Sequence, residues 1–116
     1  MPTALRTSWK TLPLPAEREH FELPVMFSDV DGERMRLGHV PEDMDDKWFI
    51  FFEEGWLYFH RSWTGHCIFA VRLDGSPCGV KVIDAWVNRD REQYNSAGLD
   101  TDITMVQQLI ANRLLS

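Results

Sequence analysis

The segment from His60 to His66 holds five residues whose side chains can do chemistry. His60 and His66 can exchange protons or bind a metal, and Ser62 can serve as a nucleophile. Arg61 can bind an anion through its planar guanidinium, and Trp63 can stack on a flat group. Three interpretations of this cluster follow, and the sequence leaves all three open.

In the first interpretation the cluster is structural. Trp63 would close one end of the hydrophobic core, while Ser62 and Thr64 would bond the backbone of a turn. Arg61 would pair with an acid on a neighbouring strand, and Asp84, in an otherwise apolar row, needs such a partner. Arg72 is the other candidate partner for Asp84.

In the second interpretation the cluster forms an anion or nucleotide pocket. Arg61 would bind a phosphate group through two parallel hydrogen bonds, with Arg89 as a further cation. Trp63, Tyr58 or Trp56 would stack on the base. The ligand-binding candidates are therefore Trp56, Tyr58, His60, Arg61, Ser62, Trp63 and Arg89.

The third interpretation is catalysis, with His60 or His66 as general base and Ser62 or Cys67 as nucleophile. A catalytic triad also needs an orienting carboxylate and an oxyanion hole. The chain contains no G-x-S-x-G, H-E-x-x-H, P-loop or G-x-G-x-x-G motif. None of its four histidines has a companion at helical spacing, so we predict no metal site and no cofactor.

A tight hairpin must position this cluster. The aromatic runs Lys47–Glu53 and Trp56–Arg61 are separated only by Glu54-Gly55, which predicts a two-residue turn. The turn pairs Glu53 with Trp56, Phe51 with Tyr58, and Phe49 with His60. The opposite face is apolar and should lie on the core; it carries Trp48, Ile50, Phe52, Leu57, Phe59 and Arg61. The first face is too aromatic to be fully wet, so we expect a helix, another chain or a ligand to cover it.

Two more strands and a helix complete the predicted fold. His66–Leu73 and Val80–Val87 read as the third and fourth central strands. A helix runs from Asp100 to about Leu115, and its apolar stripe should pack on one sheet face. The stripe consists of Ile103, Val106, Leu109, Ile110 and Leu114. The fold class is α+β: an antiparallel meander of four to five strands with the C-terminal helix packed on one face.

The chain reads as a single domain over residues 1–116, with an N-terminal arm or loop at 1–20, the central sheet at 47–88 and the helix at 101–115. Weaker patterns lie between these parts. Pro15–His20 is compatible with a short helical turn, Asp31-Gly32 with a turn, and Asn88–Tyr94 with a short helix. Phe21–Ser28 is a strand candidate that Pro24 confines to an edge.

Composition narrows the class of partner. The net charge is −6 and the acidic excess lies in the first half, so nucleic-acid binding is disfavoured. No stretch approaches a membrane span, and the first ten residues lack the apolar segment of a signal peptide. Cys67 and Cys78 form no C-x-x-C motif and read as free thiols in a reducing cytoplasm. We therefore expect a cytoplasmic protein, and a homodimer is compatible with the aromatic face.

Two segments carry a resemblance to a known family. The run from Lys47-Trp48-Phe49 to Ile68, with Tyr58-Phe59-His60-Arg61-Ser62-Trp63-Thr64-Gly65 as its specific part, is followed by Ala85-Trp86-Val87-Asn88-Arg89. Together they resemble a family of small uncharacterised bacterial proteins, over residues 44–115. Similar domains occur in some chains described as ADP-ribosylglycohydrolases. That enzyme is a large helical protein with a binuclear metal site, so the resemblance implies an accessory module near ADP-ribose chemistry and assigns no role to any residue.

We interpret the protein as a non-enzymatic binding or interaction module that uses the aromatic hairpin and the HRSWTG turn. Its partner would be a protein or a nucleotide-like small molecule. The alternative is a small nucleotide- or ADP-ribose-related enzyme, or an accessory domain, with its site at Arg61, Ser62 and His60.

Overall fold

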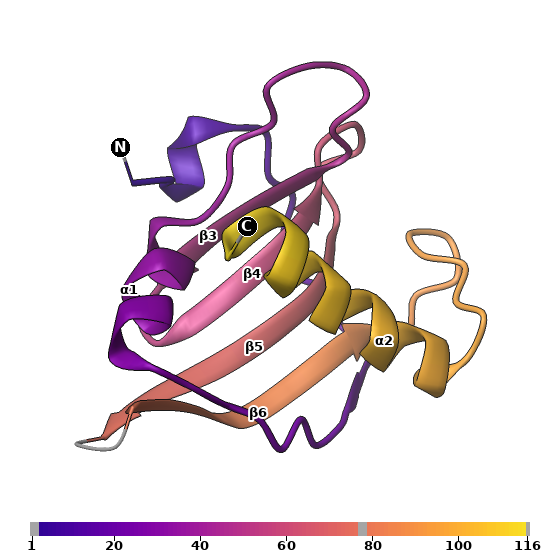
Figure 1. The fold of residues 1–116 in the computed structure, drawn as a ribbon. Helices are drawn as coiled ribbons and strands as arrows, with labels where there is room; N and C mark the ends of the chain where they lie inside the picture. Colours follow the sequence, from indigo (N-terminus) through magenta and orange to yellow (C-terminus); the bar gives the residue numbers. More distant parts are fainter. Residues whose placement is uncertain (1–2, 77–78, 116) are drawn as a thin grey trace.

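The computed structural model describes residues 3–76 and 79–115. Within them an antiparallel sheet of six strands lies behind a C-terminal helix (Figure 1). The strands are β1 (Arg18–His20), β2 (Met26–Phe27), β3 (Trp48–Glu53), β4 (Trp56–Arg61), β5 (Cys67–Ser76) and β6 (Gly79–Asn88). The helical segments are a 3₁₀ turn (Arg6–Ser8), α1 (Asp29–Leu37), α2 (Leu99–Leu109) and a π-helical extension of α2 (Ile110–Leu114).

The sheet order is β1-β6-β5-β4-β3, so β3 to β6 form the predicted meander. The sheet has six strands rather than four or five because two short segments pair with the outer edge of β6. β1 pairs near the C-terminal end of β6 and β2 near its N-terminal end. Pro24 lies between β1 and β2, at a position where its backbone need not donate a hydrogen bond to a neighbouring strand.

The hairpin register is confirmed. Glu53 lies opposite Trp56, Phe51 opposite Tyr58 and Phe49 opposite His60. Both turn residues have positive φ, 51° at Glu54 and 92° at Gly55, which matches the right-handed twist of the flanking strands.

The main core lies between the sheet and α2, as the apolar stripe predicts. Val106, Leu109, Ile110 and Leu114 are buried against the sheet, with Ile103 partly buried beside them. On the sheet side this core includes Trp48, Ile50, Leu57 and Phe59. The helix therefore covers the face that the hairpin register assigned to the core.

The other sheet face is partly covered by the N-terminal arm, which we define as residues 3–14. Its backbone is attached at two points, with Ala4 N–H donating to Leu37 O (2.7 Å) and Leu12 N–H donating to Gly65 O (2.9 Å). The indole N–H of Trp9 donates to Ser62 O at 2.8 Å. The expected cover on the aromatic face thus comes in part from the same chain.

Three of the weaker predictions were wrong. The end of Pro15–His20 is strand β1, because its backbone bonds the edge of β6. Asp31-Gly32 lies inside α1, which is capped by a hydrogen bond from Asp31 N–H to Ser28 Oγ (3.1 Å). Gly32 serves close packing there, since an added Cβ would lie 2.5 Å from Val80 Cγ2. Asn88 ends β6, and the residues after it form a turn and a loop instead of a helix.

Candidate functional site

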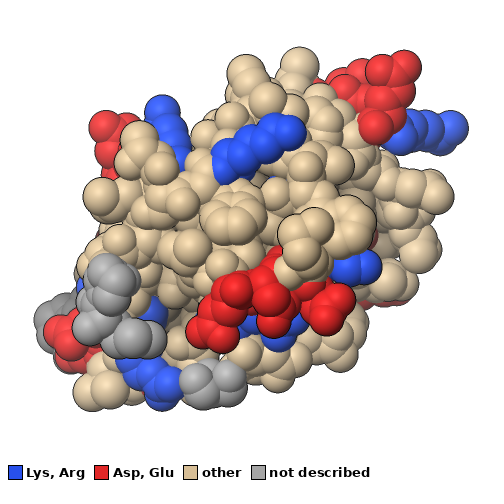
Figure 2. All heavy atoms as spheres, turned by 90° about the horizontal axis from the view of Figure 1, so that it is seen from above, with Lys and Arg blue, Asp and Glu red and all other residues tan. Residues whose placement is uncertain are grey.

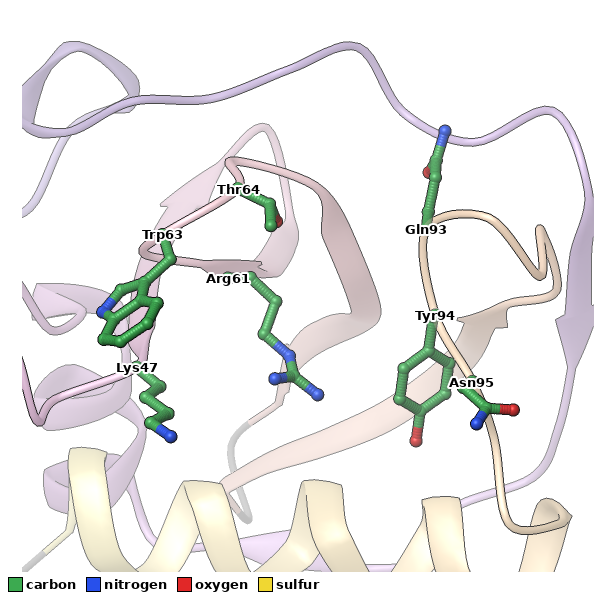
Figure 3. A pocket seen from close by; sticks show the side chains of 7 residues that line it. All are labelled: Lys47, Arg61, Trp63, Thr64, Gln93, Tyr94 and Asn95. Atoms are coloured by element: carbon green, nitrogen blue, oxygen red, sulfur yellow. The ribbon is translucent and has the colours of Figure 1, made fainter.

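A pocket of about 290 Å³ lies where three segments meet beside α2 (Figure 3). The residue before β3 contributes Lys47, the turn after β4 contributes Trp63 and Thr64, and the loop after β6 contributes three more residues. Its complete lining is Lys47, Arg61, Trp63, Thr64, Gln93, Tyr94 and Asn95. We call it the Arg61 pocket.

Arg61 is the central cation of this pocket. Its guanidinium carbon lies 5.0 Å from the centre of the Trp48 ring, which holds the side chain along the end of the core. Figure 3 shows the guanidinium between the Trp63 and Tyr94 side chains. Its Nε is buried without a hydrogen-bond partner, and no carboxylate among the described residues lies within 4.0 Å of it. A charge left unpaired at a pocket is the feature of an anion site.

Lys47 and Trp63 form one wall of the Arg61 pocket. Lys47 Nζ lies 5.4 Å from the centre of the Trp63 ring, and within the described chain it has no ion pair. The Trp63 indole N–H donates to Met44 O at 3.0 Å, although 59% of this residue is exposed. The hydrogen bond at the indole nitrogen therefore fixes the edge of the Trp63 ring, and part of the ring face stays exposed for a ligand to stack on.

The wall of the pocket that contains Tyr94 is held in place by a buried carboxylate. Asp102, in the first turn of α2, is fully buried and accepts hydrogen bonds from Tyr94 Oη (2.5 Å), Ser96 Oγ (2.7 Å) and Arg89 Nη1 (2.8 Å). Arg89 Nε also donates to Glu19 at 2.7 Å. Burial and the neighbouring Asp102 carboxylate raise the pKa of Tyr94, so its hydroxyl stays protonated and donates. This Asp102 clasp ties the loop after β6 to α2 and β1.

The structure divides the predicted ligand-binding residues. Arg61 and Trp63 line the Arg61 pocket, while Arg89 belongs to the Asp102 clasp. Ser62 is buried and donates through Oγ to Asp46 O at 2.9 Å. Tyr58, His60 and Trp56 project from the other face of the sheet. There Trp56 packs on Tyr58, and Phe51 packs on both Tyr58 and His60.

The expected pairing of Asp84 with Arg61 or Arg72 was wrong. Asp84 Oδ1 lies 3.0 Å from His20 Nδ1, on strand β1, which the sequence did not reveal. Arg72 is opposite Asp84 in the β5–β6 register, but its guanidinium carbon lies 5.9 Å from the centre of the Trp56 ring. Arg61 is two strands away from β6.

The described contacts give no support to catalysis. His60 Nδ1 is 2.8 Å from Gly65 O, and His60 Nε2 and His66 Nδ1 are buried without hydrogen-bond partners. No hydrogen bond joins either histidine to Ser62 or Cys67 within the described chain. Burial raises the pKa of the Cys67 thiol, which is fully buried and therefore unsuited to act as a nucleophile. Cys78 lies outside the described residues.

Sequence reasoning missed five pocket residues: Lys47, Thr64, Gln93, Tyr94 and Asn95. Lys47 could have been identified from the sequence, because it directly precedes β3. That strand pairs with β4, which leads into the turn that carries Trp63. Gln93 and Tyr94 end the segment expected to be helical, and Asn95 follows it. Tyr94 is held by its hydrogen bond to Asp102, and Gln93 Oε1 accepts a hydrogen bond from Asn88 Nδ2.

Figure 2 shows the molecule from above in the view of Figure 1. On the described part of this face, Lys and Arg side chains are scattered singly instead of forming a continuous basic strip. Of the helices in the described chain, none is both long and apolar enough to cross a lipid bilayer.

The chain was also compared with known proteins. It matches no family model, no curated protein and no solved structure.

Proposed function

We propose that this protein is a non-enzymatic binding module and that the Arg61 pocket takes a small, nucleotide-like anion. A single observation carries the proposal: the Arg61 guanidinium enters a pocket without any carboxylate partner among the described residues, and its Nε is buried and unbonded. A bound oxyanion would pair with the guanidinium. Because Nε has no free surface in the unliganded protein, a bond from Nε to the ligand requires a pocket side chain to move.

The pocket walls favour a ligand with both charge and a flat group. Lys47 adds a second cation, and the exposed Trp63 ring offers a stacking surface. Gln93 and Asn95 supply amide donors and acceptors of the kind that bind base or sugar edges. The resemblance to domains associated with ADP-ribose chemistry makes ADP-ribose the first ligand to try. The buried free thiol of Cys67 fits the expected cytoplasmic location.

The test is ligand-dependent thermal stabilisation. ADP-ribose, ADP and pyrophosphate are added to the protein at rising concentration and the midpoint of unfolding is followed. Binding to the native state alone stabilises it by about 2.7 kcal/mol at a ligand concentration 100 times Kd. Arg61→Ala should weaken binding by about 10- to 100-fold, the loss of a hydrogen-bonded charge.

Arg72→Ala is the matched control. Both arginines stack on a tryptophan, Arg61 on Trp48 and Arg72 on Trp56, so both substitutions remove a similar contact. Only Arg61 lines the pocket. Equal loss of ligand stabilisation in the two variants, or no stabilisation of the wild type by any of the three compounds, would contradict the proposal.

A protein partner is the second candidate, favoured by the exposed neighbours Met44 and Trp63 (73% and 59% exposed), which are joined by a hydrogen bond. Such exposed aromatic and methionine side chains are enriched at protein interfaces. A homodimer formed through these residues would show a concentration-dependent mass in sedimentation, lost in Trp63→Ser.

A further inference from the structure

A second pocket lies on the opposite face of the sheet, between the N-terminal arm and the β3–β4 hairpin. Its volume is about 410 Å³ and its lining is Arg6, Thr11, Leu12, Pro13, Leu14, Phe51, Tyr58 and His60. We call it the His60 pocket. It shares no residue with the Arg61 pocket, and it lies within the size range of small-molecule sites.

His60 is the distinctive polar group of this pocket. It is only 2% exposed, and its Nδ1 lies 2.8 Å from Gly65 O. A carbonyl accepts hydrogen bonds, so Nδ1 carries the proton and Nε2 of the neutral ring carries a lone pair. Nε2 is buried and has no hydrogen-bond partner among the described residues. A buried acceptor without a donor is unfavourable, and a ligand that donates to it would relieve the deficit.

The rest of the lining is aromatic and apolar. The Phe51 ring centre lies 5.3 Å from that of Tyr58 and 5.5 Å from that of His60, which makes a continuous ring surface. The cation at the pocket, Arg6, is already paired with Glu53. A neutral planar molecule therefore matches this wall better than an anion.

We propose that the His60 pocket binds a small neutral aromatic molecule that carries one O–H or N–H donor, of the phenol or indole class. The ring lies against Tyr58 and Phe51, and the donor bonds His60 Nε2. Because Nε2 has no free surface in the unliganded protein, binding moves a side chain of the pocket, and Leu14, 40% exposed on the arm, is one that can move. This site is independent of the Arg61 pocket and of its proposed anion.

The test uses phenol as probe and toluene as a control of similar shape without the donor. Ring ¹⁵N spectra of the wild-type protein report on His60 Nε2 directly, without any substitution. Phenol should shift the Nε2 resonance and the Leu12, Leu14 and Tyr58 signals. Toluene should bind about tenfold more weakly, the worth of one hydrogen bond, and leave Nε2 unshifted.

His60→Phe keeps a ring and removes the acceptor, so phenol should lose its advantage over toluene. His20→Phe, an exposed histidine on the far strand β1, should bind phenol like the wild type. Equal affinity for phenol and toluene, an Nε2 signal unmoved by saturating phenol, or no binding of phenol would each overturn this assignment. The spectra of the wild type decide the outcome even if His60→Phe fails to fold.

Discussion

Replacing Asp102 with alanine should be among the most damaging single changes to this fold. The carboxylate is fully buried and accepts three hydrogen bonds, from Tyr94, Ser96 and Arg89. Its loss leaves the buried Tyr94 hydroxyl without an acceptor, at about 1–3 kcal/mol, and removes the buried partner of Arg89. Arg89 keeps its bond to Glu19 and its side chain is 24% exposed, so its own penalty is partial. We expect a total loss of about 3–5 kcal/mol in the free energy of unfolding.

Urea denaturation measures this loss, with Asp100→Ala as the matched control. Asp100 lies in the same first turn of α2 and is exposed, so its replacement removes the same interaction with the helix dipole without touching the clasp. The Asp100 variant should lose less than about 1 kcal/mol. Similar losses in the two variants would refute the conclusion that the clasp holds the loop after β6 in place.

Two further predictions concern other parts of the fold. Gly38→Ala should destabilise the protein by more than the ~1–2 kcal/mol typical of a positive-φ site, because φ is 72° and the new Cβ would lie 2.3 Å from Ile50 O. Gly55→Ala, at φ 92° with open space around it, should cost only that backbone term in the same denaturation assay, and equal losses would contradict the packing argument. Burial lowers the pKa of His60 in the native state. As pH falls below the ordinary histidine pKa of about 6.5, the unfolded state therefore gains a proton before the native state does. The free energy of unfolding should then fall by up to ~1.4 kcal/mol per pH unit. His60→Gln should show a shallower decline between pH 7 and 5, and parallel curves would contradict the assignment.

The parts of the fold that follow from local chemistry could be predicted from the sequence. Glu54-Gly55 sets the turn, and the period of two in the flanking strands then determines both faces of the hairpin. The apolar stripe of α2 likewise identifies its buried side. These signals depend on neighbouring residues alone.

The parts that were missed depend on tertiary contacts. α1 has few buried residues and contains Gly32, which resembles a turn signal until Val80 is seen packed against it. β1 is three residues long and is a strand only because β6 offers a free edge. The site shows the same limit: Arg61 and Trp63 were identified from their types, whereas Tyr94 reaches the pocket through Asp102.

The separation of Arg61 from His60 also has a physical cause. Neighbouring residues of a strand point to opposite faces of the sheet, so one cluster in the sequence supplies two chemically different pockets. The Arg61 pocket is cationic and the His60 pocket is aromatic and neutral.

The most direct test of the central claim is a ¹H–¹⁵N titration with ADP-ribose. The Trp63 indole N–H reports on the Arg61 pocket, and the Trp9 indole N–H, bonded to Ser62 O outside that pocket, serves as internal reference. We predict saturable shifts of the Trp63 indole and of the Tyr94 and Asn95 amides. Arg61→Ala should need a ligand concentration about 10- to 100-fold higher for the same shifts, and Arg72→Ala should respond like the wild type. Shifts confined to other surfaces, or none at millimolar ligand, would contradict an anion site at Arg61.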